Sequence, residues 1–132
     1  MTEEPQEERT VDIDDAIAAA ATMTRGQILT SGSPERTNAQ RKFLRGLGQS
    51  LAPVVYVGAR GAIRSVVNAV IEQLEIHELI KIRVHESSNM TTEVAALWLR
   101  GETGADIVQI MGHNLVLYKA RKEKPSIRLP KD

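Results

Sequence analysis

Residues 53–74 contain the two patterns that most constrain the fold, a short apolar run and a long helical stripe. The run PVVYV (residues 53–57) is typical of a buried strand. A helical face follows, because apolar residues recur at the spacing of one face of a helix: Ile63, Val66, Val67, Val70, Ile71 and Leu74. We therefore predict a strand over 53–57 and a helix from about residue 63. The GARG segment (residues 58–61) forms the turn between them.

The remaining elements follow from local signals on both sides of this unit. Thr37 and Gln40 have the spacing of a capping box and predict a helix over 38–48. Residues 79–84 alternate in polarity like a half-exposed strand, and residues 92–103 read as a helix. Strands over 106–111 and 114–118 flank Gly112-His113, a tight hairpin turn. The predicted fold class is α/β, a four-stranded mixed sheet with three helices.

The N-terminal segment differs in charge from the rest of the 132-residue chain. Residues 1–33 carry a net charge of −5, and residues 34–132 carry +5. We predict an acidic, flexible extension over 1–34, with a possible short helix within 11–23, and one folded domain over 35–132. The positive charge of the domain favours a polyanionic partner, or it serves only for solubility.

The GARG turn has the composition of a phosphate-binding loop. Glycine permits close backbone approaches, and a helix N-terminus directs free N–H groups and positive potential to one point. The chain lacks the glycine-lysine pattern of a mononucleotide P-loop and the three-glycine fingerprint of dinucleotide sites. A Gly-x-x-Gly loop clamps the nucleic-acid backbone in one class of RNA-binding domain. An ordinary turn between strand and helix is the alternative.

Basic residues surround this turn in the sequence and also extend well beyond it. If they converge in space, they form the electrostatic surface expected for phosphate contacts; otherwise they are scattered surface charges. Aromatic residues are only 3% of the chain, so we do not expect base stacking to dominate affinity. The predicted RNA-contacting residues are Arg41, Lys42, Arg45, Gly58, Ala59, Arg60, Gly61, Arg64, Lys81, Arg83, Lys119 and Arg121.

Signals for other function classes are weak. No cysteine is present, and His77-Glu78 lacks the second histidine of a metallopeptidase motif because position 81 is lysine. No local motif marks a nucleophile, and Trp98 fits a core position. We predict no metal, no cofactor and no catalysis. No apolar stretch is long enough to span a bilayer, so we expect a cytoplasmic protein.

Several separated motifs resemble one known family. They are LRGL (44–47), LAPVVYVGARG (51–61), HELIKI (77–82), ETGA (102–105), and VQIMG with LVLY (108–112 and 115–118). Together they are similar to the CRM domain, the chloroplast RNA splicing and ribosome maturation module, and to its single-domain bacterial YhbY-like members. The resemblance covers about residues 37–130.

This resemblance implies a fold like the C-terminal domain of translation initiation factor three. It also implies an RNA-binding loop at Gly58–Gly61 and association with precursors of the large ribosomal subunit. We expect a non-enzymatic monomer that binds ribosomal RNA, with no DNA or membrane partner; the alternative is a protein-interaction module on ribosomal particles. Position 59 is alanine where the family often has lysine, and residues 1–33 lie outside the resemblance.

Overall fold

The structure, a computed structural model, describes residues 5–32 and 36–131. Its helices are α1 (Asp14–Thr22), α2 (Arg25–Ser31), α3 (Asn38–Gln49), α4 (Arg64–His77) and α5 (Thr92–Thr103), with short 3-10 turns η1 (Gln6–Glu8) and η2 (Glu86–Ser88). Its strands are β1 (Pro53–Val57), β2 (Leu79–Val84), β3 (Asp106–Met111) and β4 (Asn114–Tyr118).

The four strands form one mixed sheet in the order β1-β2-β4-β3. β1 and β2 are parallel because α4 crosses over between them, whereas β4 is antiparallel to both β2 and β3. Gly112 has a φ of +58° in the hairpin between β3 and β4, a conformation that favours glycine. The predicted four-stranded mixed α/β fold is confirmed. Helix α1 lies within 11–23, where a short helix was considered, and α2 was not predicted.

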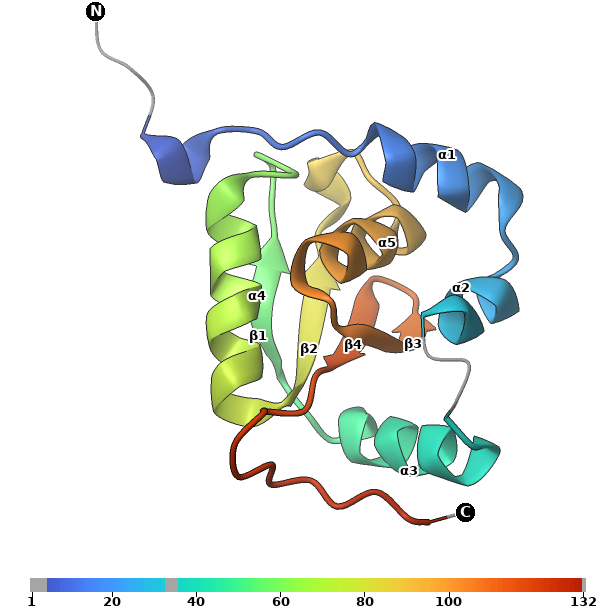
Figure 1. The fold of residues 1–132 in the computed structure, drawn as a ribbon. Helices are drawn as coiled ribbons and strands as arrows, with labels where there is room; N and C mark the ends of the chain where they lie inside the picture. The colour runs from blue at the N-terminus through green and yellow to red at the C-terminus, as the bar shows by residue number, and fades with distance from the viewer. Residues whose placement is uncertain (1–4, 33–35, 132) are drawn as a thin grey trace, which may run out of the picture.

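Helices α4 and α5 cover one face of the sheet and enclose the main core (Figure 1). Alternate residues of β1, β2 and β4 point into it, which is the period-two pattern of a strand with one face buried. In β3 a register shift between Ile107 and Gln109 breaks this alternation, and Ile107 and Ile110 enter the core. On α4, five of the six stripe positions predicted from the sequence are buried, and Ile71 is the exception, with 49% of its surface exposed. Trp98 of α5 is a core residue, as predicted.

The opposite face of the sheet is covered only in part. Helix α3 packs Leu44 against Leu79, Val116 and Tyr118, near the end of the sheet where β2 begins. Its predicted capping box is present, with Gln40 N–H donating to the Thr37 hydroxyl. The β1 side of this face stays open to solvent.

Residues 5–32 pack against the domain, which differs from the flexible extension expected for 1–34. Helices α1 and α2 lie against α5 (Figure 1), and Ala16 and Ile28 enter the main core. The Arg100 guanidinium donates to the Ile28 carbonyl and to the Ser31 hydroxyl, which ties α2 to α5. These few apolar side chains are enough to dock α1 and α2 because they fill space beside α5. Residues 1–4 and 33–34 lie outside the described residues.

Glu78 holds the C-terminal segment in place. Its carboxylate accepts hydrogen bonds from the backbone N–H groups of Arg121, Ser126 and Ile127 and from the Ser126 hydroxyl, at 2.6–3.0 Å. Burial alone raises the pKa of this carboxyl, but these hydrogen bonds outweigh it and lower the pKa to about 2. The C-terminal segment runs as irregular chain anchored on Glu78.

Candidate nucleic-acid interface

The GARG turn joins the end of β1 to the start of α4. Gly61 N–H donates to the Gly58 carbonyl at 2.9 Å, so the four residues close a β-turn. Ala59 and Arg60 occupy its two central positions and are exposed. The turn is therefore a preformed projection at one end of the sheet.

The two glycines of this turn have different structural requirements. Gly61 has a φ of +67°, and a Cβ atom there would lie 3.2 Å from the Ser88 carbonyl oxygen. Gly58 has no positive φ, and a Cβ atom there would meet nothing within 4 Å. The fold itself accounts for Gly61 but leaves the absence of a side chain at Gly58 unexplained.

The two predicted arginines of the turn region each face a carboxylate. One Arg60 nitrogen lies 3.6 Å from a Glu8 carboxylate oxygen, and another donates to the Glu8 carbonyl at 3.3 Å. One nitrogen of Arg64, in the first turn of α4, lies 3.5 Å from a carboxylate oxygen of Glu102 on α5. These pairs are exposed, and such pairs contribute only roughly 0–1 kcal/mol each, so a stronger anion can replace the carboxylates.

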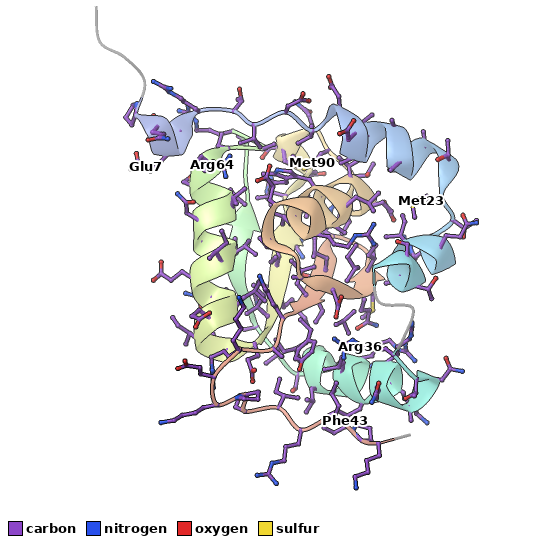
Figure 2. All side chains as sticks on the ribbon, in the orientation of Figure 1. Glu7, Met23, Arg36, Phe43, Arg64 and Met90 are labelled. Carbon is purple, nitrogen blue, oxygen red and sulfur yellow. The ribbon has the colours of Figure 1, made fainter. Side chains whose placement is uncertain are left out.

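Residues 5–12, which we call the N-terminal strap, cross the start of α4 (Figure 2). Arg64 N–H, the first amide of the helix, donates to the Arg9 carbonyl at 3.0 Å. Val11 N–H donates to the Ala62 carbonyl at 2.8 Å, and Thr10 pairs with Ile63 as an isolated bridge. The sequence predicted that the helix N-terminus directs free N–H groups at a phosphate. The strap instead takes the first of these amides.

The other predicted basic residues do not form one surface with the turn. Arg83 lies nearest, on β2 opposite Tyr56 of β1, and is exposed. Lys81 is half-buried and donates to the Gln49 carbonyl at the end of α3. Three of the predicted cations belong to α3, which lies at the far end of the sheet from the turn: Arg41, Lys42 and Arg45. Figure 2 shows Phe43 of the same helix beside the C-terminal segment.

Lys119 and Arg121 lie at the end of the molecule opposite the turn. The Lys119 ammonium donates to the Thr103 carbonyl at 2.6 Å, at the end of α5. The Arg121 guanidinium donates to the Glu75 and Ile76 carbonyls at the end of α4, at 3.2 and 3.0 Å. Twelve residues of helix separate Arg64 from Ile76, which is about 18 Å. Both side chains bind helix C-termini, where cations are stabilised.

Two contacts escaped sequence reasoning, one at the turn and one at the opposite end of the sheet. The strap reaches the turn through backbone pairing and Glu8, and the only available signal was the excess of carboxylates before residue 16. Glu78 was noted as part of a motif, but no sequence pattern indicated that it binds residues more than 40 positions away.

Residues 5–32 and 36–131 contain no group of three histidine, aspartate or glutamate side chains placed to hold a metal ion. No helix in those same ranges is long and apolar enough to cross a membrane.

Comparison with known proteins gives consistent matches to one family. Residues 37–119 match the family model of the CRS1 / YhbY (CRM) domain. An RNA-binding protein of Haemophilus influenzae is 38% identical over 92 residues, covering 70% of this chain and 92% of that protein. A candidate RNA-binding protein of Bacillus subtilis, YqeI, is 35% identical over 95 residues, covering 71% of this chain and 98% of its own length.

A solved structure agrees with these sequence matches. The solution structure of a candidate RNA-binding protein from Staphylococcus aureus superposes with a TM-score of 0.58 at 30% identity. The match covers 71% of this chain and 98% of that protein. The fold of the matched part of the chain is therefore similar to that of a solved relative.

Proposed function

Because the chain belongs to the CRS1 / YhbY (CRM) domain family, we propose that it binds RNA by holding backbone phosphates against the GARG turn. The observation that carries the proposal is the open space at Gly58, where the fold requires no glycine. A glycine without an internal reason is expected where another backbone approaches closely. Exposed Arg60 beside it supplies a cation for a phosphate oxygen.

We propose large-subunit ribosomal RNA, or its precursor particle, as the natural ligand, and the cytoplasm as the place of action. The family resemblance supports this choice. We further propose that the protein works as a non-enzymatic monomer, assisting RNA folding during assembly. Nuclease treatment of a native lysate distinguishes this proposal from the alternative, a module that binds a ribosomal protein. Digestion of RNA releases the protein from its particles if RNA holds it there.

The strap acts, in this proposal, as a competitor of RNA. Glu8 lies on the arginine proposed to bind phosphate, and the strap backbone bonds the first amide of α4. RNA binding at the turn therefore requires the strap to move or to share the site. The strap thereby acts as a local brake on RNA binding at the turn.

Replacement of Arg60 tests the proposed contact. Arg60→Ala should weaken binding of purified large-subunit ribosomal RNA and lower the slope of log affinity against log salt by roughly 1, because one phosphate contact is lost. Arg128→Ala is the matched control, since this arginine is exposed in the C-terminal segment, away from the turn. An unchanged affinity and slope for Arg60→Ala, or an equal loss for Arg128→Ala, would contradict the proposal.

A further inference from the structure

The open part of the sheet carries an exposed tyrosine next to the proposed phosphate site. Tyr56 of β1 points away from the core because its neighbours Val55 and Val57 point into it. Its surface is 60% exposed, more than that of any other large hydrophobic side chain in the described residues. The second tyrosine, Tyr118, is 3% exposed and contacts Arg36. Burial in the fold therefore explains Tyr118, whereas most of the surface of Tyr56 is open to solvent.

The surroundings of this ring favour a polyanion. Tyr56 pairs in register with Arg83 on β2, and paired residues of neighbouring strands lie on the same face. Arg83 is exposed, and half-buried Lys81 follows on the same face of the strand. The cations beside the ring favour an anionic ligand at this part of the sheet.

The ring also lies at the right separation from the turn. Gly58 follows Tyr56 by two residues, which is about 7 Å along a strand. A nucleotide whose phosphate contacts the turn can therefore extend its base along β1 as far as the ring. Base pairs inside an A-form helix keep their faces stacked on one another, so only an unpaired base has a face available.

We propose that Tyr56 stacks one unpaired RNA base, with Arg83 beside it, when the neighbouring phosphate binds the GARG turn. This inference rests on the proposed function and narrows the ligand to single-stranded RNA or to a loop within a folded RNA. Stacking of this kind tolerates all four bases, because each has a π face. The scarcity of aromatic residues hid the subsite in the sequence, since one well-placed ring is enough for one base.

The test compares Tyr56→Thr with Tyr56→Phe in binding a labelled 12-nucleotide single-stranded oligoadenylate and a 12-base-pair RNA duplex. Threonine keeps a high β-propensity without a ring, and phenylalanine keeps the ring. Tyr56→Thr should bind the single strand roughly 10-fold more weakly, since base stacking on an aromatic residue is worth ~1–3 kcal/mol. Duplex binding and the salt slope should not change, because no phosphate contact is lost. Tyr56→Phe should bind both probes as the wild type does.

Val54→Thr is a control on the same strand and face, because it alters an exposed side chain without removing a ring. Unchanged single-strand binding by Tyr56→Thr, or an equal loss for both probes, overturns the stacking subsite. If Arg60→Ala nonetheless lowers affinity and salt slope, the proposed function stands and only this inference fails. If the wild type binds neither probe nor ribosomal RNA, the proposed function fails first.

Discussion

Alanine substitutions at the two glycines of the turn should separate a glycine required by the fold from one required by the ligand. At Gly61, with φ of +67°, an alanine costs about 1–2 kcal/mol for the left-handed backbone. The added Cβ would also lie 3.2 Å from the Ser88 oxygen, and this contact increases the cost. At Gly58 the Cβ meets nothing within 4 Å, so folding stability should stay the same or rise by about 0.4–1 kcal/mol.

RNA affinity should fall in the Gly58 variant, although this variant keeps its folding stability. A methyl group at Gly58 holds the phosphate away from the backbone, and a charge-assisted hydrogen bond is worth about 1.5–3 kcal/mol. Gly58→Ala should therefore lose about 10-fold or more in affinity for ribosomal RNA while its folding is intact. Urea unfolding and fluorescence anisotropy measure the two quantities on the same samples. Wild-type affinity in Gly58→Ala would refute the reasoning that open space at this glycine marks the ligand.

Three further substitutions test the strap, the buried glutamate and the packing of α2. Glu8→Gln should tighten RNA binding by roughly 1.5-fold to 5-fold at low salt, since an exposed ion pair is worth about 0.2–1 kcal/mol. Glu7→Gln, the same change one residue earlier, is its control, and an equal effect of both would argue against a local brake. Glu78→Gln should lower the free energy of unfolding by about 2 kcal/mol at pH 7, because the neutral amide replaces one acceptor oxygen with a donor and removes the charge that strengthens the remaining hydrogen bonds. The folded pKa near 2 lies below the ordinary 4.5, so this stabilisation is present above about pH 4.5 and is lost as the pH falls towards 2. Acid titration of stability should therefore be shallower in the variant, and an unchanged titration would contradict the assignment. Ile28→Ala should cost about 3 kcal/mol in urea unfolding, because Ile28 is 1% exposed, and an unchanged stability would mean that α2 is not part of the cooperative unit.

Most of the sheet and its helices could be predicted because their signals are local. The capping box at Thr37, the apolar run at 53–57 and the glycine at 112 each act within a few residues of chain. The prediction of the apolar stripe on α4 was almost entirely correct for the same reason. Ile71 was misjudged because periodicity gives the direction of a side chain but not how far the neighbouring helix extends.

The parts that could not be predicted depend on contacts between distant segments. The strap pairs residues 9–11 with residues 62–64, and α2 docks through Arg100, about 70 positions away. Composition marked the N-terminal segment as acidic and poor in large apolar groups, which is also the composition of a flexible extension. Only the shape of the α5 surface distinguishes a docked segment from a free one. That shape exists only after the domain has folded.

Cations with the same charge serve different purposes at the two ends of the sheet. Lys119 and Arg121 bind backbone carbonyls at helix C-termini, so moving them to a phosphate would leave those carbonyls unpaired. The exposed pairs of Arg60 with Glu8 and of Arg64 with Glu102 are worth only roughly 0–1 kcal/mol each, so an RNA phosphate can compete with these carboxylates. A count of positive charges along the sequence therefore does not separate cations with a structural role from cations open to a ligand. Our proposal places the RNA contact at the turn that contains Gly58 because the ion pairs there are exposed and weak.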